Sequence, residues 1–112
     1  MSKIISLKRN SDFQRLYRKG KSAVRRTMVV YSAGGIKDKI RLGITASKKI
    51  GGAVLRNRAK RRIRELFRNA QVSIIPGKDV CIVARSAIIS ADAARVKKDF
   101  DSAISELGLN KS

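Results

Sequence analysis

The thirteen residues at 56–68, RNRAKRRIRELFR, combine the apolar spacing of a helix with an unusual density of positive charge. The apolar positions fall on one helix face: Leu55, Ala59, Ile63, Leu66 and Phe67. The cations occupy most other positions: Arg56, Arg58, Lys60, Arg61, Arg62, Arg64 and Arg68. Only about a third of the circumference of such a helix is apolar and can pack against a core. A solvated face usually mixes signs, whereas Glu65 is the one acid here, so the stretch favours an anionic partner.

The net charge of the whole chain indicates the same kind of partner. Its 112 residues carry 27 lysines and arginines against 8 aspartates and glutamates, a formal charge of +19. A compact domain with this charge repels itself unless a polyanion, such as nucleic acid or an acidic membrane, neutralises it. The length predicts a single domain over residues 1–112. No apolar run approaches the roughly 18 residues that span a bilayer, and the N-terminus lacks a signal-peptide block. We therefore expect a cytoplasmic protein with no membrane partner.

Catalysis by the protein itself is not expected. Histidine, the commonest general base and metal ligand, is absent. Cys81 lies in an apolar run and is expected to be a buried, inert thiol. No two of the eight acids have a spacing that places them together on one element. We expect no catalytic residue and no metal ligand in the chain, although folding can bring distant acids together.

The N-terminal residues are expected to form one short helix. Residues 1–10 are basic and lack apolar periodicity, which predicts an irregular arm. The helix is predicted from Ser11, whose spacing from Gln14 matches a capping box, to Gly20. Its apolar face would carry Phe13, Leu16 and Tyr17.

Extended segments are predicted next. Residues 22–27 are expected to be extended, and residues 28–31 are rich in strand-forming side chains. Residues 41–47 alternate in polarity, as in a half-buried strand. The loop at Gly34-Gly35 predicts that the strands at 28–31 and 41–47 pair antiparallel.

The second half of the chain alternates helix and strand. Residues 47–52, with two lysines and two glycines, predict a mobile connection into a helix over 53–70. The apolar run at 79–85 predicts a strand that is buried on both faces and parallel to a neighbour. A last helix is predicted from an N-cap at Ser90 to Gly108. This order is that of an α+β sandwich with one mixed sheet.

The five aromatic residues form two groups. Phe67 and Phe100 lie on helical apolar stripes and are expected in the core. Phe13, Tyr17 and Tyr31 are less clear, because cations surround them in the sequence. They either belong to the core or stack on the bases of single-stranded nucleic acid, where each stacked base contributes about 1–3 kcal/mol.

Arginine outnumbers lysine within residues 56–68, and its planar fork suits phosphate better than the point charge of lysine. Asn57 lies between two of these arginines. It has two readings of equal weight: helix capping, or a hydrogen bond to a base edge, a 2′-hydroxyl or a metal-bound water.

Residues 43–68, GITASKKIGGAVLRNRAKRRIRELFR, resemble the signature of the bacterial ribonuclease P protein component. The match rests on SKKIG at 47–51, on AV at 53–54, and on RNR at 56–58 with the basic residues that follow. The residues DFQ at 12–14, followed by Tyr17, are similar to the first helix of the family. The late strand ending in Ala84-Arg85 also fits, so the resemblance extends over the whole chain.

The resemblance implies both a fold and a function. The fold would be a two-layer α+β sandwich of α-β-β-β-α-β-α order, with a mixed four-stranded sheet and a left-handed crossover around the basic helix. The function would be that of the protein subunit of ribonuclease P, an endonuclease that removes the 5′ leader of precursor tRNA. The catalytic site and its Mg²⁺ would belong mainly to the RNA subunit, and no other protein would be required. A small structural RNA-binding protein of the ribosomal type is the alternative.

The resemblance also implies two sets of binding residues. The residues that bind the catalytic RNA would be Lys48, Lys49, Arg56, Asn57, Arg58, Lys60, Arg61, Arg64 and Arg68. A cleft between the first helix and the sheet would bind the leader through Phe13, Tyr17 and Tyr31. The chain departs from the family at Gly52, where asparagine is common, and at Tyr17, where phenylalanine is frequent. Gly52 leaves the start of the basic helix less fixed, and Tyr17 keeps the ring and adds a hydroxyl.

Overall fold

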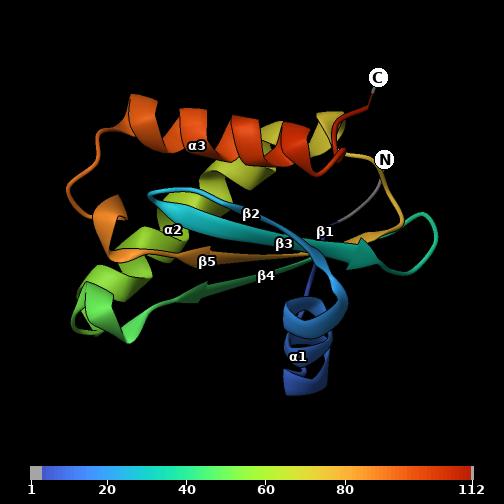
Figure 1. The fold of residues 1–112 in the computed structure, drawn as a ribbon, viewed down its shortest axis with the longest axis horizontal. Coiled ribbons are helices and arrows are strands. Elements are labelled where there is room, and N and C mark those ends of the chain that lie inside the picture. The colour runs from blue at the N-terminus through green and yellow to red at the C-terminus, as the bar shows by residue number, and fades with distance from the viewer. Residues whose placement is uncertain (1–3, 112) are drawn as a thin grey trace.

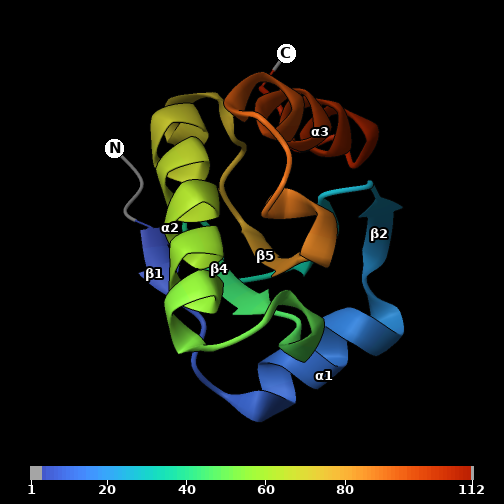
Figure 2. The same cartoon turned by 90° about the vertical axis from the view of Figure 1, so that its left-hand side faces the viewer.

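A five-stranded mixed sheet runs through the computed structural model, which describes residues 4–111 (Figure 1). Along the chain the elements are β1 (Ile4–Ser6), α1 (Asn10–Lys19), β2 (Lys21–Val24), β3 (Met28–Gly34), β4 (Ile40–Ala46), α2 (Ala53–Ala70), β5 (Lys78–Ala84) and α3 (Ala93–Glu106). Short 3₁₀ turns lie at Lys48–Ile50 (η1), Gln71–Ser73 (η2) and Ser86–Ile88 (η3). The strands lie in the order β1-β4-β5-β3-β2. Helices α2 and α3 cover one face of the sheet, and α1 covers part of the other (Figure 2).

The predicted α+β class is confirmed, with one strand more than predicted. The extra strand is β1, which pairs parallel with β4 and places Ile4 opposite Ile40. The prediction of an irregular arm over residues 1–10 was therefore wrong at β1, while residues 1–3 lie outside the described residues. Three residues are too few to show a period, and their partner strand lies far along the chain, so no local pattern indicates this pairing.

Strand β5 lies in the centre of the sheet because its side chains are buried on both faces. Val80 and Ile82 join the core under α2 and α3, whereas Cys81 packs on the α1 side. β5 is parallel to β4, which confirms the crossover through α2, and antiparallel to β3. The predicted pairing of β3 with β4 was wrong, since β5 lies between them. The loop joining these two strands crosses the start of β5, where the Gly35 N–H donates to the Gly77 carbonyl at 2.9 Å.

The start of α1 differs from the prediction, and its end agrees. The helix begins at Asn10, and its N-cap, Arg9, makes no side-chain capping bond. The capping box predicted for Ser11 and Gln14 is therefore absent, because both residues already lie inside the helix. Gly20 is the C-cap residue, as expected.

The N-cap of α3 is Asp92 rather than the predicted Ser90. Its carboxylate accepts a hydrogen bond from the Arg95 N–H at 2.8 Å. The chain around Ser90 instead forms a turn, in which the Ala91 N–H donates to the Ala87 carbonyl at 3.1 Å. The helix ends before Gly108, whose φ of 68° is the left-handed conformation of a helix stop.

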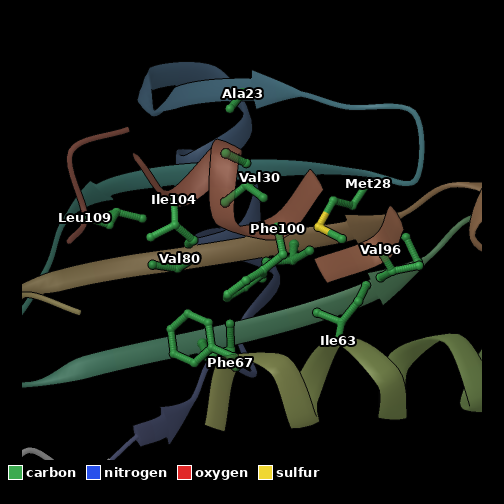
Figure 3. Packing of buried hydrophobic residues seen from close by; sticks show 14 of the residues in the cluster. Ala23, Met28, Val30, Ile63, Phe67, Val80, Val96, Phe100, Ile104 and Leu109 are labelled. Atoms are coloured by element: carbon green, nitrogen blue, oxygen red, sulfur yellow. The ribbon is translucent and has the colours of Figure 1, made fainter. Parts of the chain in front are cut away.

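The main core lies between the sheet and the layer formed by α2 and α3 (Figure 3). The observed bounds of α2 are those predicted, and its narrow apolar face buries Ala59, Ile63 and Phe67. The rings of Phe67 and Phe100 meet edge to face, with centroids 6.3 Å apart. Both phenylalanines are core residues, as predicted.

A buried carboxylate, that of Asp99, joins α3 to the turn between β2 and β3. It accepts hydrogen bonds from the Thr27 hydroxyl at 2.7 Å and the Thr27 N–H at 3.2 Å, and Arg95 lies 3.3 Å away. Burial raises the pKa of Asp99, but the Thr27 hydrogen bonds, with the charges of Arg95 and Arg25, lower it by more. Because the folded-state pKa is lowered, Asp99 stabilises the fold above its unfolded-state pKa. That stabilisation is lost as the pH falls through the folded-state pKa.

Replacing Asp99 with asparagine should therefore reduce the free energy of unfolding by about 1–3 kcal/mol at neutral pH. The difference from wild type should begin to shrink as the pH falls below the unfolded-state pKa of aspartate, about 3.9, and should vanish below the lower folded-state pKa of Asp99. Urea unfolding across this range measures both effects. Asp101→Asn is the control, since it removes an exposed carboxylate of the same helix and should change stability by less than about 1 kcal/mol. An Asp99→Asn effect that does not vary with pH would contradict the assignment.

Candidate nucleic-acid interface

The side of α2 away from the core is a continuous cationic surface. We call it the basic face and define it, with the turn before the helix, by the predicted RNA-binding residues: Lys48, Lys49, Arg56, Asn57, Arg58, Lys60, Arg61, Arg64 and Arg68. Arg56 and Lys60 are half-buried and the other seven are exposed. The structure thus brings all the predicted residues onto one helix and its preceding turn.

The acids of the chain lie elsewhere. Within residues 4–111, every recorded ion pair involves one of five cations: Arg15, Arg25, Arg41, Arg95 and Lys97. In this part of the chain no carboxylate lies within ion-pair distance of the basic face. Folding therefore neutralises α1, the sheet and α3 in part, and leaves the positive charge of α2 uncompensated.

The connection into α2, predicted to be mobile, contains a 3₁₀ turn at Lys48–Ile50. The Ser47 hydroxyl accepts a hydrogen bond from the Lys49 N–H at 3.2 Å, and Ile50 is buried in the main core. Gly51 has a φ of 130°, a conformation that side chains with a Cβ rarely adopt. Gly51 was predicted from the sequence to make the connection mobile. In the structure, its positive φ lets it end the turn directly after the buried Ile50.

Asn57 is exposed in the second turn of α2, so the capping interpretation is wrong. The N-cap is Gly52, which offers no side chain, as the departure from the family predicted. Asn57 lines a hollow of about 270 Å³ with Arg56 and Lys60. The Arg56 Nε is buried there and has no hydrogen-bond partner among the described residues.

Arg62 is a cation of α2 with a structural role. Its guanidinium donates to the carbonyl oxygens of Ile88, at 2.8 Å, and Ala91, at 3.3 Å. These bonds fix the chain between β5 and α3 onto the side of α2. Arg62 therefore does not belong to the basic face.

The three aromatic residues that the resemblance placed in a cleft, and that residue pattern alone left open, lie together between α1 and the sheet. We call Phe13, Tyr17 and Tyr31 the aromatic cluster. The ring centroids of Phe13 and Tyr17 are 6.5 Å apart, and those of Tyr17 and Tyr31 are 5.0 Å apart. Phe13 and Tyr31 pack on a small core of Leu7, Leu16 and Cys81 and are half-buried, whereas Tyr17 is 38% exposed. The rings are thus partly core and partly surface.

The hydroxyl of Tyr17 is directed toward Cys81 rather than to solvent. The Tyr17 oxygen lies 3.7 Å from the Cys81 sulfur. Burial, with the neighbouring thiol, raises the pKa of Tyr17 to about 12, and burial raises the pKa of Cys81 to about 11. Both groups are therefore protonated near neutral pH, and Cys81 is the buried, unreactive thiol that its strand predicted.

A buried carboxylate that the sequence analysis did not single out holds α1 to the sheet. Asp79 has no exposed side-chain surface, and its carboxylate accepts two hydrogen bonds from Arg41, at 2.8 and 2.6 Å, and one from Arg15. These bonds raise the pKa of Arg41. Arg41 and Asp79 are register partners on adjacent strands. The sequence feature that could have identified Asp79 is an acid at the start of a strand predicted to be buried, because a buried carboxylate requires a cationic partner.

Two kinds of site are absent from the described residues. Within 4–111, no three acidic, cysteine or histidine side chains are close enough together to hold a metal ion. No helix in that part of the chain is both long and apolar enough to cross a membrane.

The fold and its surfaces define a class: small cationic α+β proteins with a positive helix on one side of the sheet and partly exposed aromatic rings on the other, features that suit nucleic acid. The family model described as Ribonuclease P matches residues 1–108. The chain therefore belongs to the ribonuclease P protein component family, as the resemblance in its sequence predicted.

Relatives and solved structures agree with this assignment. The ribonuclease P protein component of Staphylococcus haemolyticus is 48% identical over 85 residues, covering 76% of this chain and 74% of that protein. The Staphylococcus aureus protein of the same name is 49% identical over 86 residues, with coverage of 76% and 74%. The solved RNase P protein of S. aureus has a TM-score of 0.86 at 36% identity, covering 97% of this chain and 100% of that one. The RNase P protein of Thermotoga maritima has a TM-score of 0.77 at 30% identity, covering 87% and 92%.

Proposed function

We propose that this chain is the protein subunit of ribonuclease P, a ribonucleoprotein endonuclease that removes the 5′ leader of precursor tRNA. The observation that carries the proposal is the basic face, whose cations have no acidic partner among residues 4–111, in a member of this family. Arginine forks on a rigid helix suit the phosphates of a folded RNA. We assign this face to the catalytic RNA and place the complex in the cytoplasm.

The aromatic cluster is assigned to the leader. Single-stranded RNA exposes base faces that can stack on rings, whereas the bases of a duplex are already stacked. The cluster lies on the α1 side of the sheet, and the layer of α2 and α3 lies on the other side. The aromatic cluster and most of the basic face can therefore bind two RNA segments at the same time.

In this proposal the protein contributes binding and orientation, and the RNA subunit contributes the reaction. The described carboxylates do not suit a protein-held Mg²⁺, because those of Asp12, Asp79 and Asp99 pair with arginines and no metal-binding cluster forms. We therefore assign the ion to the RNA. The protein's contribution is to hold the leader and the catalytic RNA together.

Reconstitution tests the proposal against the ribosomal-type alternative. The protein is mixed with a bacterial ribonuclease P RNA at low Mg²⁺, with precursor tRNA as substrate and no other protein. Leader removal should be faster with the protein than with the RNA alone, and the protein alone should cleave nothing. A structural RNA-binding protein would bind the RNA without stimulating cleavage, and that outcome would reject the proposal.

Shortening the rings of the aromatic cluster should weaken binding of precursor tRNA selectively. Phe13→Ala and Tyr17→Ala, in the protein assembled with the catalytic RNA, are each expected to reduce affinity for precursor tRNA by about ten-fold, because each removes a stacking surface. Affinity for mature tRNA should change little, since mature tRNA has no leader. Fluorescence anisotropy with both labelled RNAs gives the comparison.

Two further variants separate stacking from packing. Tyr17→Phe keeps the ring and loses only the contact with Cys81, so its affinity for precursor tRNA should match wild type. Ile36→Ala removes an exposed apolar side chain outside the cluster and should also have no effect. Equal losses for precursor and mature tRNA in Phe13→Ala and Tyr17→Ala would mean that the rings serve the core and not the leader.

A further inference from the structure

A hollow of about 470 Å³ lies at the edge of the sheet, where β1 ends beside the C-terminal half of α2. We call it the edge hollow. It is lined by β1 and Leu7, by residues 42–44 of β4, and by Arg64, Arg68 and Gln71. This volume is within the range of sites that hold small molecules, and it is large enough for one nucleotide.

The backbone of β4 is open where it borders the edge hollow. The Leu42 carbonyl accepts a bond from the Leu7 N–H at 2.9 Å, while the Ser47 N–H donates toward β5, to Ala84, at 3.2 Å. Backbone groups alternate in direction along a strand, so Ile44 points the same way as Leu42, away from β5. The β1 pairing stops at Leu42, and no residue within 4–111 bonds to the N–H or C=O of Ile44 on this side. An unpaired edge of this kind is a template for hydrogen bonding.

The edge hollow also has two cations suited to phosphate. Arg64 and Arg68 are one turn apart on α2, both are exposed, and neither has an acidic partner among the described residues. A phosphate between two guanidiniums forms charge-assisted hydrogen bonds.

The position of the edge hollow connects the two surfaces already described. Gly43 lines it, and a side chain on Gly43 would overlap the ring of Phe13 and the side chain of Leu7. The aromatic cluster is therefore separated from the edge hollow by a single glycine and one leucine. Arg64 and Arg68 on its far wall belong to the basic face.

We propose that the edge hollow is a subsite for one nucleotide of the single-stranded RNA that leaves the aromatic cluster toward the basic face. The free N–H and C=O of Ile44 present one donor and one acceptor to a base edge, and Arg64 with Arg68 holds the adjoining phosphate. The inference rests on the proposed function, because it requires single-stranded RNA at the aromatic cluster. The subsite adds a position at which backbone groups of the protein form hydrogen bonds with an RNA base.

Filling the edge hollow tests the proposal. Ser6 lines it and is exposed, so Ser6→Trp should occupy the space without entering the core. Anisotropy with a labelled single-stranded octauridine is expected to show about ten-fold weaker binding than wild type, the effect of losing one bound base. Ser105→Trp, on the exposed side of α3, is the matched control and should bind as wild type does.

The outcomes separate this inference from the proposed function. If Ser6→Trp binds octauridine like wild type while Phe13→Ala binds more weakly, the subsite is wrong and the leader assignment stands. If wild type does not bind octauridine at low salt, both fail.

A second measurement on the wild-type protein avoids any question of misfolding. Amide hydrogen exchange by NMR should become slower at Ile44 when octauridine is added, because its N–H gains a partner. An Ile44 exchange rate unchanged at saturating octauridine would overturn the subsite.

Discussion

An Asp79→Ala variant is expected to lose about 3–5 kcal/mol of its free energy of unfolding, the amount typical of breaking a buried ion pair. The Asp79 carboxylate is buried between β4, β5 and α1, and it pairs with both Arg41 and Arg15. Without it, two guanidiniums remain close together in a chain that already carries a charge of +19. Urea unfolding followed by circular dichroism measures the loss.

The control for this variant is Asp101→Ala, which removes the same charge from an exposed pair. Asp101 accepts from Lys97 at 2.6 Å, and both side chains are more than half exposed, so the loss should stay below about 1 kcal/mol. Equal losses in the two variants would indicate that net charge, and not the buried network, determines the effect. Because Arg15 lies on the same helix as Phe13 and Tyr17, Asp79→Ala should also weaken binding of the precursor tRNA leader.

The features that sequence predicts well are those whose signal is local. The bounds of α2 were predicted correctly because its apolar side chains repeat with the helix period over many turns. The burial of β5 on both faces followed from a nearly continuous apolar run of strand length. The basic face needed no tertiary information, since all its residues lie on one helix and the turn before it.

The features that sequence missed depend on contacts between distant segments. β1 becomes a strand only because β4 is available beside it. The order of the strands depends on β5 entering between β3 and β4, and Gly34-Gly35 gives no sign of this. Residue pattern alone could not assemble the aromatic cluster, because Tyr31 comes from a strand and the other two from α1, and only the family resemblance placed the three in one cleft. Asp79 was visible as an acid in an apolar run, yet its partners were not.

The distribution of acids explains how so basic a chain folds. Asp12 and Asp79 form ion pairs with Arg15 of α1. Asp99 and Asp101 pair with cations of α3, and Glu106 pairs with Arg25 in the turn that α3 contacts. Asp12, Asp79, Asp99 and Glu106 place negative charge where cations lie against the sheet or the neighbouring turn, while Asp101 pairs with Lys97 on the exposed side of α3. Little is placed on α2, so the repulsion there remains until an anion binds. The cations that form ion pairs and stabilise the fold are thus different from the α2 cations proposed to bind RNA.

Raising monovalent salt from 50 to 200 mM is expected to weaken RNA binding by roughly 250- to 1,000-fold, if the exposed cations of the basic face each neutralise one phosphate. The six are Lys48, Lys49, Arg58, Arg61, Arg64 and Arg68. Each contributes about −0.7 to −0.9 to the slope of log affinity against log salt, so the expected slope is about −4 to −5. Filter binding or anisotropy with a ribonuclease P RNA over this range gives the slope.

Two triple variants test where on the protein this charge acts. Changing Arg58, Arg61 and Arg64 to glutamine should make the slope shallower by about 2 to 3, because three phosphate contacts are lost. Changing Arg95, Lys97 and Lys98 on α3 removes the same total charge, but two of these already pair with Asp99 and Asp101. The α3 variant should therefore keep a slope near that of wild type. If both variants shift the slope equally, overall charge and not the basic face governs binding, and the assignment of α2 to the RNA is wrong.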